Sequence, residues 1–268
     1  MIPKIIHYCW FGGKPLPAAA QKCIASWKKY CPDYEIHAWT EENYDIASAP
    51  LYVRQAYEAK KWAFVTDVVR LYALDRFGGV YMDTDVEVVR PIDEFLKHHA
   101  FSGFEDEVNI PTGIMAAEQG HPLIKELLEH YDARPFLVDG EPDLTTNVKT
   151  ITDLLTPKGF LPNNQFQEVA GLALYPYDYF CPQDIHTMEI RVTENTYTIH
   201  HFAGSWLPKE DLSRRSYKLR KLRVEKRLGP RWANLFETLH YARKKNGGAG
   251  LERYIKNRLL RIFRKRGR

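Results

Sequence analysis

The sequence is poor in cysteine and lacks long apolar runs. The first shortage argues against a disulfide or zinc framework, and the second against a membrane-spanning helix. The four cysteines form no C-x-x-C pair and have no zinc-ligand spacing, which indicates free thiols in a reducing compartment. No apolar run approaches the roughly 18 residues of a membrane-spanning helix. The segment from Met1 to Phe11 has only a short apolar run interrupted by a lysine and a histidine, so we expect no signal peptide.

What the chain has instead is length, aromatic residues and an uneven distribution of charge. Its 268 residues allow one large α/β domain or two small ones. Residues 209–268 hold 21 of the 38 Lys and Arg and 5 of the 34 Asp and Glu, so this tail carries +16 and the rest of the chain −12. An acidic body with a basic tail predicts a site that holds a cation and a surface that meets something anionic.

The first forty residues have the pattern of a nucleotide-binding sheet. Residues 4–10 form a predicted strand, residues 18–29 an amphipathic helix, and residues 35–39 a second strand. Strand, helix and strand at this spacing predict a parallel sheet, in which ligands bind at the carboxyl ends of strands. Trp10 and Phe11, followed by two glycines, stand at such an end, where they are placed to receive a base.

The stretch GGVYMDTDVEV at residues 78–88 carries the chemistry. We interpret it as one buried strand with Asp83 and Asp85 set into its middle, where strand alternation places both on the same side. Burying ionised carboxylates is costly unless a cation meets them, and two oxygen donors aimed at one point describe a Mg²⁺ or Mn²⁺ site. The alternative is that the strand ends at Met82 and the aspartates occupy a solvated turn.

A predicted helix pair, residues 51–60 and 62–77, precedes this stretch, and its second member is apolar on more than one face. Asp67 and Arg70 lie three residues apart on that helix, within reach of each other. They form either an internal ion pair or a pair that reaches the ligand beside Asp83 and Asp85, and the residues alone leave both open.

The rest of the body alternates short helices and strands. Helices are predicted at 91–98, 123–131 and 146–155, a loop at 132–145, and strands at 101–104, 114–117, 172–175 and 197–201. The last strand ends in a loop with two histidines, a glycine, Ser205 and Trp206. We expect His201 to supply a third metal ligand, with His200 as the reserve because the two point to opposite sides of a strand.

Four segments in this order resemble family 32 glycosyltransferases, the DXD-containing sugar-binding group of bacterial capsular and surface-polysaccharide transferases. Their more distant relatives are the yeast initiating mannosyltransferase and the clostridial glucosylating toxins. The segments are IPKIIHYCWFGG at residues 2–13, TDVVR at 66–70, GGVYMDTD at 78–85 and HHFAGSW at 200–206. Thr66 stands where the family commonly has serine, which keeps the hydroxyl.

The resemblance implies a GT-A (Rossmann-like) α/β fold over residues 1–208, followed by a basic helical tail over residues 209–268. It implies a retaining hexosyl transfer from a nucleoside-diphosphate sugar, in particular a UDP-sugar, with Mn²⁺ or Mg²⁺ as cofactor. The catalytic residues expected are Asp67, Arg70, Asp83 and Asp85. Metal ligation is expected from Asp85, His201 and Asp83, and donor contacts from Trp10, Phe11, Asp67, Arg70, Tyr81, Asp83, Ser205 and Trp206.

The tail has apolar residues at helical spacing in three stretches, separated by Gly229-Pro230 and Asn246-Gly247-Gly248. These helices either pack on the body or form an anchor for an anionic membrane surface. The second reading suits an acceptor that is a lipid-linked glycan in polysaccharide or capsule assembly, and a peripheral location on the cytoplasmic face of a bacterial membrane. Nucleic acid is a less favoured partner.

Two other functions remain open from the residues alone. A phosphatase of the haloacid dehalogenase type also places D-x-D after a strand, but it requires Thr or Val two residues beyond the second Asp, where this chain has Glu87. A basic-tailed nucleic-acid binder, with structural aspartates, is the alternative that is not an enzyme. Metal-dependent binding of a nucleoside diphosphate distinguishes a transferase from that binder.

Overall fold

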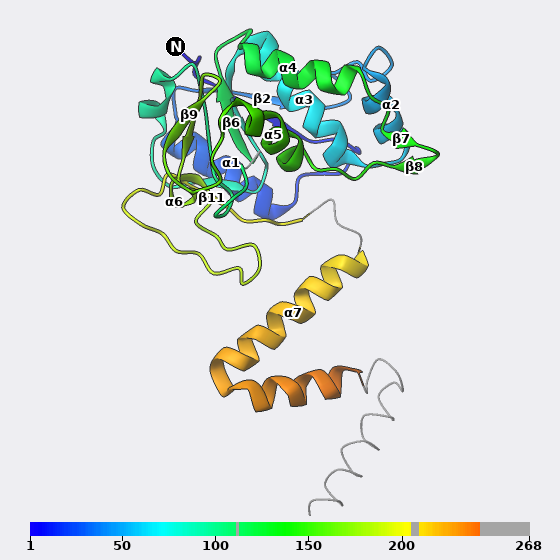
Figure 1. Ribbon diagram of the computed structural model, residues 1–268, viewed down its shortest axis with the longest axis vertical. Coiled ribbons are helices and arrows are strands. Elements are labelled where there is room, and N and C mark those ends of the chain that lie inside the picture. Colours follow the sequence, from blue (N-terminus) through cyan, green and yellow to red (C-terminus); the bar gives the residue numbers. More distant parts are fainter. Residues whose placement is uncertain (111–112, 205–208, 242–268) are drawn as a thin grey trace, which may run out of the picture. The chain divides into compact units, whose positions relative to one another are not determined.

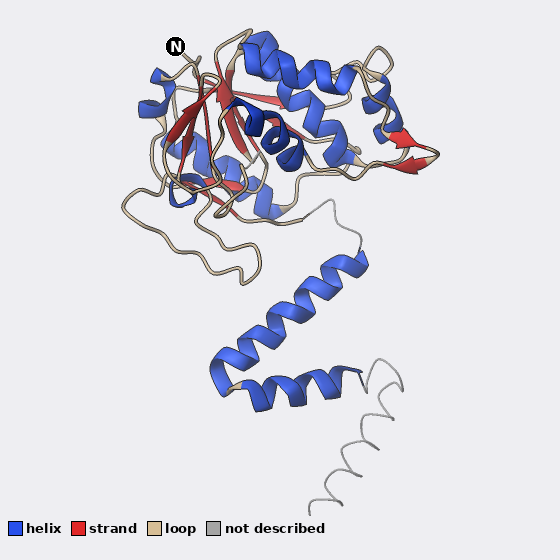
Figure 2. Ribbon diagram, viewed as in Figure 1, coloured by secondary structure: helices blue, strands red, loops and turns tan. Residues whose placement is uncertain are grey.

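In the computed structural model, residues 1–110, 113–204 and 209–241 are described. The chain divides into two units, Met1–Trp206 and Leu207–Arg268. The first unit contains a seven-stranded sheet with helices on both sides (Figures 1 and 2). The prediction of an α/β fold is therefore confirmed.

The sheet is mixed, with the strand order β2-β1-β3-β6-β5-β10-β9. Strands β1, β2, β3, β5 and β10 run in one direction, and β6 and β9 run against them. The bounds in this order are Glu35–Trp39, Ile5–Cys9, Gly79–Met82, Ile114–Ala117, Ala100–Gly103, Leu172–Tyr175 and Gln167–Val169. The carboxyl ends of five strands thus lie along one edge, where an α/β sheet commonly binds its ligand.

Each face of the sheet is covered by its own apolar cluster. Along β3, Tyr81 packs into the cluster that contains the buried side of α3, while Val80 and Met82 pack into the opposite cluster with Trp27 of α1, as strand alternation requires. The helices of the first cluster are α2 (Leu51–Glu58), α3 (Trp62–Phe77), α4 (Pro122–Asp132) and α5 (Asn147–Leu155). The opposite face is covered by α1 (Ala18–Tyr30), the 3-10 helix η1 (Asp93–Lys97) and α6 (Tyr177–Phe180).

The sequence prediction of one continuous strand through Asp83 and Asp85 is wrong. Strand β3 ends at Met82, residues 84–85 form a turn, and β4 (Val86–Val88) pairs antiparallel with β11 (Thr198–His200) in a separate two-stranded sheet. The turn is closed by the backbone N–H of Val86, which donates to the carbonyl of Asp83 at 2.9 Å. The valines resume a strand because β11 provides a new hydrogen-bonding partner.

Several smaller elements were not predicted from the sequence. The segment predicted as a loop at 132–145 contains the two-residue strands β7 (Leu137–Val138) and β8 (Glu141–Pro142). A 3-10 turn, η2 (Thr156–Lys158), follows α5, and β9 and α6 flank the predicted strand β10. These elements are two to four residues long, which is too short for a hydrophobic period to reveal.

The second unit is helical where it is described. Helix α7 (Lys209–Leu228) is followed by helical residues 230–241. The ring of Tyr217 lies against those of His240 and Phe236, at centroid distances of 4.1 and 5.8 Å. Leu222 and Leu228 are exposed, so they do not form the buried stripe expected of an amphipathic helix.

The last predicted tail helix, residues 251–263, lies outside the described residues. Of the helices that the structure describes, none combines the length and the apolar character that crossing a membrane requires.

Candidate functional site

The carboxyl edge of the sheet brings the first and third sequence motifs together. Strands β1 and β3 pair in parallel, with His7 opposite Tyr81. Two residues further along, Cys9 comes level with Asp83, so Trp10 follows at the same edge. The polar residues of both motifs therefore lie where the fold favours a ligand.

Asp83, Asp85 and His200 gather at this edge. One ligand atom from each residue lies within 4.8 Å of the others. His200 Nε2 is 3.3 Å from Asp85 Oδ1 and 4.0 Å from Asp83 Oδ2, and the three side chains are only 15 to 26% exposed. The turn after β3 supplies the two carboxylates, and β11 supplies the imidazole through its pairing with β4.

Each carboxylate uses one oxygen to fix its orientation and turns the other toward His200. Asp83 Oδ1 accepts a hydrogen bond from the hydroxyl of Tyr81 at 2.7 Å and lies 3.5 Å from Arg70 Nη2. Asp85 Oδ2 accepts the backbone N–H of Ala203 at 2.7 Å. Asp83 Oδ2, Asp85 Oδ1 and His200 Nε2 thus form a held set of donor atoms.

The histidine beside the two aspartates is His200, the reserve of the sequence analysis, and not the expected His201. In the β4–β11 ladder, His200 pairs with the buried Val86, and Ile199 pairs with Glu87. Alternation then places His201 on the same face as Glu87, and its Nε2 lies 2.8 Å from Glu87 Oε2. The backbone N–H of His201 still donates to the carbonyl of Asp85 at 3.0 Å, so His201 contacts the turn through its backbone.

Arg70 and Asp67 lie beneath the cluster and are almost fully buried, at 4 and 8% exposure. Arg70 Nη2 lies 3.1 Å from Asp67 Oδ1, and the guanidinium stands 4.5 Å over the ring of Tyr81. The internal ion pair, one of the two readings left open from the sequence, is present in the structure, and Arg70 of this pair also lies beside Asp83. Arg70 and Tyr81 both contact Asp83, the residue through which they are joined to the cluster.

The charges of this group shift its proton equilibria. Burial raises the pKa of Asp67 to about 6, with Arg70 opposing the rise and Asp83 adding to it. Burial by itself raises the pKa of Asp85 and lowers that of His200. Their mutual hydrogen bond and opposite charge outweigh this effect, so the pKa of Asp85 falls and that of His200 rises well above its usual value. A cation bound by Nε2 has to displace this proton.

The donor set fits a divalent cation of the kind expected from the sequence. Two carboxylate oxygens and one imidazole nitrogen suit Mn²⁺ or Mg²⁺ better than a soft, thiolate-seeking metal. Cys181, the thiol near this site, faces Nδ1 of His200 on the far side of the ring from the carboxylates. The three donors leave further positions for oxygens of a ligand.

The two aromatic residues expected to contact the base differ in their exposure. Trp10 is partly exposed, and its indole N–H donates to the carbonyl of Lys14 at 2.5 Å, whereas Phe11 is buried and packs edge-on to Tyr44. Trp10 therefore remains available for stacking, and Phe11 is part of the core. Ser205 and Trp206 lie outside the described residues.

Three residues near the cluster carried no recognisable sequence signal. Glu105, two residues beyond β5, is close enough that His200 and Asp83 both influence its pKa, which burial raises. Gly113 accepts the backbone N–H of Asp83 through its carbonyl at 2.8 Å, and Cys181 Sγ lies 3.9 Å from His200 Nδ1. Their proximity depends on the sheet order, which no local pattern reveals.

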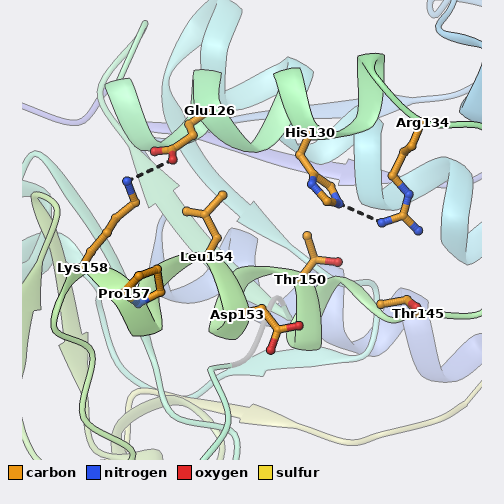
Figure 3. A pocket seen from close by; sticks show the side chains of 9 residues that line it. All are labelled: Glu126, His130, Arg134, Thr145, Thr150, Asp153, Leu154, Pro157 and Lys158. Carbon is orange, nitrogen blue, oxygen red and sulfur yellow. Dashed lines mark hydrogen bonds and ion pairs between the residues drawn. The ribbon is translucent and has the colours of Figure 1, made fainter.

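A separate open pocket of about 460 Å³ lies between α4 and the segment formed by α5 and η2 (Figure 3). Four of its polar groups pair with one another: Lys158 lies 2.9 Å from Glu126, and Arg134 donates to His130 at 2.8 Å. It contains none of the residues of the Asp83, Asp85 and His200 cluster. We therefore place the candidate chemistry at the sheet edge rather than in this pocket.

Comparison with known families identifies the region that holds the two aspartates. Residues 17–102 match the family model described as the glycosyltransferase sugar-binding region containing DXD motif. This match covers about a third of the chain, and it makes residues 17–102 similar to the sugar-binding region of that family. The matched residues include Asp67, Arg70, Asp83 and Asp85, so the resemblance predicted from the sequence is confirmed.

Curated proteins that are similar to this chain are named as sugar transferases. The inositol phosphoceramide mannosyltransferase 3 of Schizosaccharomyces pombe is 30% identical over 137 residues, covering 48% of this chain and 37% of that protein. The human alpha-1,4-N-acetylglucosaminyltransferase is 27% identical over 145 residues, covering 52% of this chain and 39% of that protein. The chain thus spans well under half the length of these relatives.

Among solved structures, the galactosyltransferase LgtC in complex with donor and acceptor sugar analogs has a TM-score of 0.41 and 14% identity, covering 81% of this chain and 95% of that chain. This is a partial likeness, so we rest the assignment on the family match. The mixed sheet with flanking helices agrees with the α/β class predicted from the sequence.

Proposed function

We propose that the chain is a metal-dependent glycosyltransferase that moves a hexosyl group from a nucleoside-diphosphate sugar, in particular a UDP-sugar, to an acceptor hydroxyl. The observation that carries the proposal is the set of donor atoms from Asp83, Asp85 and His200, held at the carboxyl edge of the sheet. The two aspartates lie within the region that matches the DXD family. Mn²⁺ or Mg²⁺ is the cofactor that the donor set suits.

In the proposed reaction the bond between the anomeric carbon and the β-phosphate oxygen breaks, and a bond to the acceptor oxygen forms with retained configuration. The nucleoside diphosphate leaves with the bonding electron pair, and the proton of the acceptor hydroxyl is taken up by the leaving diphosphate or by solvent. A bound divalent cation supplies Lewis-acid stabilisation of the charge that develops on the leaving diphosphate. Asp83, Asp85 and His200 would hold that cation.

The remaining residues of the site support this set. Tyr81 and Arg70 orient Asp83, and Asp67 pairs with Arg70 beneath it. Arg70 is buried and contacts the carboxylates of Asp67 and Asp83, so we assign it the role of holding Asp83 in place. Trp10, partly exposed at the same edge, is placed to stack on the base.

We further propose that the acceptor is lipid-linked and that the protein works at the cytoplasmic face of a bacterial membrane, in surface or capsular polysaccharide assembly. Two features support this proposal: relatives named inositol phosphoceramide mannosyltransferases act, by name, on a lipid, and the tail from residue 209 carries +16. A basic surface beside anionic lipid favours reversible attachment.

The test of the proposed activity is a thermal-shift panel with the full chain. UDP, GDP, UDP-glucose, UDP-galactose, UDP-N-acetylglucosamine and GDP-mannose are each added with and without Mn²⁺. We expect the nucleotides of one base, either uracil or guanine, to raise the melting temperature of the chain, because a ligand that binds only the folded state stabilises it. Mn²⁺ should increase that rise. The preferred sugar nucleotide is then tested for hydrolysis and transfer. A chain that binds Mn²⁺ but none of these nucleotides would contradict the proposal.

A further inference from the structure

His200 is enclosed on the sides that do not face the two aspartates. Its ring lies 4.2 Å from the ring of Phe202, its Nδ1 lies 3.9 Å from Cys181 Sγ, and its Nε2 points toward Asp85. Gly113 adjoins the same ring: a Cβ added there would lie 2.8 Å from Nδ1 and 2.9 Å from Cε1. Side chains essentially never approach so closely, so the ring occupies space that only glycine leaves.

Gly113 also connects the imidazole to the first carboxylate. Its carbonyl accepts the backbone N–H of Asp83 at 2.8 Å, while its Cα faces the His200 ring. The residue thus fixes the start of the Asp83 turn and the position of the imidazole at once. A methyl group at this position forces a shift of one or both.

Cys181 lies beside the nitrogen of His200 that faces away from the carboxylates. The thiol is 2% exposed and lies on the Nδ1 side of the ring, and Asp85 lies on the Nε2 side. When Nε2 gives its lone pair to a cation, the ring proton has to sit on Nδ1, where the sulfur of Cys181 accepts it. Such outer partners fix the tautomer and the orientation of a metal-bound histidine.

The backbone of Phe202 completes this arrangement. Its φ angle is +48°, in the left-handed region that a bulky residue rarely adopts. This turn lets the ring of Phe202 pack on His200 while the next backbone N–H, that of Ala203, donates to Asp85 Oδ2. Strained backbone of this kind persists where the surroundings fix it.

We infer that Gly113 and Cys181 are positioning residues that hold His200 with Nε2 toward Asp83 and Asp85, and so set the affinity of the site for a divalent cation. The inference rests on the metal site of the proposed function. It assigns a role to two residues outside the donor set of Asp83, Asp85 and His200.

The experiment measures Mn²⁺ affinity by titration of the free ion in electron paramagnetic resonance, with the full chain. Variants G113A and C181A are compared with C181S, which keeps an acceptor at the same place. Two controls accompany them: C31A removes another buried thiol, and G140A substitutes a glycine whose added Cβ meets nothing within 4 Å but whose φ of +84° strains the backbone of an alanine, so it controls for a loss of stability alone. Melting temperatures show how much of each effect is a general loss of stability.

We expect G113A and C181A to weaken Mn²⁺ binding by roughly tenfold or more, the usual effect of losing an outer partner of a metal ligand. C181S should lose less, and C31A and G140A should bind as the natural chain does. In the ¹⁵N spectrum of the Mg²⁺-loaded protein, His200 should carry its proton on Nδ1 in the natural chain and in C181S. A mixed tautomer is expected in C181A.

Equal Mn²⁺ affinity in C181A, C181S and C31A, with unchanged His200 signals, would overturn the role of Cys181. Should G113A not fold, the cysteine variants still decide the inference. A natural chain that binds Mn²⁺ and a nucleotide, with variants that bind Mn²⁺ equally well, refutes only the positioning role. A natural chain that binds no Mn²⁺ refutes the proposed metal site and this inference together.

Discussion

Asp85 Oδ1 lies 3.3 Å from His200 Nε2, and the other carboxylate oxygen of Asp85 accepts the backbone N–H of Ala203. This relationship joins the turn after β3 to the end of β11. It gives the carboxylate one oxygen that is held by the protein and one that faces the other donors. The first prediction concerns this residue.

We expect Asp85→Asn to abolish metal-dependent nucleotide binding and sugar transfer, because the amide cannot supply the anionic oxygen that Mn²⁺ prefers. Binding is measured by thermal shift and transfer by release of the nucleoside diphosphate. Asp153→Asn, which changes an exposed carboxylate on α5, is the matched control. Turnover near that of the natural chain in Asp85→Asn would show that the metal assignment is wrong.

The two adjacent histidines give a paired prediction. His200→Ala should lose most of the Mn²⁺ affinity, since it removes one of three donors, and His201→Ala should keep it because His201 Nε2 faces Glu87. Titration of Mn²⁺ with both variants checks this. Affinity lost only in His201→Ala would restore the ligand predicted from the sequence.

Trp10→Ala should weaken nucleotide binding by roughly 1–3 kcal/mol, the range for a base stacked on an aromatic ring. Trp10→Phe should recover part of this, since it keeps a ring at the same place. Isothermal titration with the preferred nucleoside diphosphate measures the effect. A Trp10→Ala variant that melts earlier but binds the nucleotide unchanged would show that Trp10 serves packing alone.

The sequence predicts well those features that depend on local pattern. Strands at residues 35–39 and 114–117 and the helix at 62–77 have the same bounds in the structure, because their alternation and apolar periodicity are complete within each segment. The match of four ordered motifs to a family supplied the fold class and placed Asp83 and Asp85 in the site.

The features that failed depend on pairing between distant segments. The valines after Asp85 have a strand pattern, but their partner is β11, more than a hundred residues later, so the break at Asp83 could not be predicted. The register of that pairing also decides which histidine faces the aspartates. Gly113 and Cys181 approach His200 through the same tertiary arrangement, and no local pattern distinguishes them from other glycines and cysteines.

Buried His7 predicts how the stability of the body depends on pH. Trp39 Nε1 donates to His7 Nδ1 at 3.2 Å, and His7 Nε2 lies 2.9 Å from the carbonyl of Gly78, so the neutral ring with its proton on Nε2 satisfies both partners. Burial lowers the pKa of His7 to about 4. Between about pH 6.5 and 4 the unfolded chain therefore binds a proton that the folded chain does not, and stability falls as the pH falls.

The lowered pKa of His7 corresponds to a loss of about 3 kcal/mol in the free energy of unfolding at pH values below 4, relative to pH 7. Urea unfolding from pH 7 to pH 4 measures it, comparing the natural chain with His7→Gln and with His186→Gln, an exposed control. His7→Gln should be less stable at pH 7 but should show a flatter loss toward pH 4. Parallel curves for the natural chain and His7→Gln would contradict the buried neutral histidine.

The last prediction concerns the basic tail. In α7, nine Lys and Arg stand against Glu210, Asp211 and Glu225, and the exposed Leu222 and Leu228 add apolar surface. Each basic residue near an anionic membrane contributes about 1 kcal/mol to binding. We therefore expect the full chain to co-sediment with vesicles in proportion to their anionic lipid content, and to be released by salt.

Two shorter chains locate the binding surface. A chain ending at Asn246 keeps α7 and the helical residues 230–241, and one ending at Gly204 loses the whole tail. If the last segment is the anchor, the chain ending at Asn246 should bind much more weakly than the full chain. If α7 is sufficient, both should bind equally and only the chain ending at Gly204 should fail. Absence of binding by the full chain at low salt would show that the tail serves packing or an oligomer contact instead.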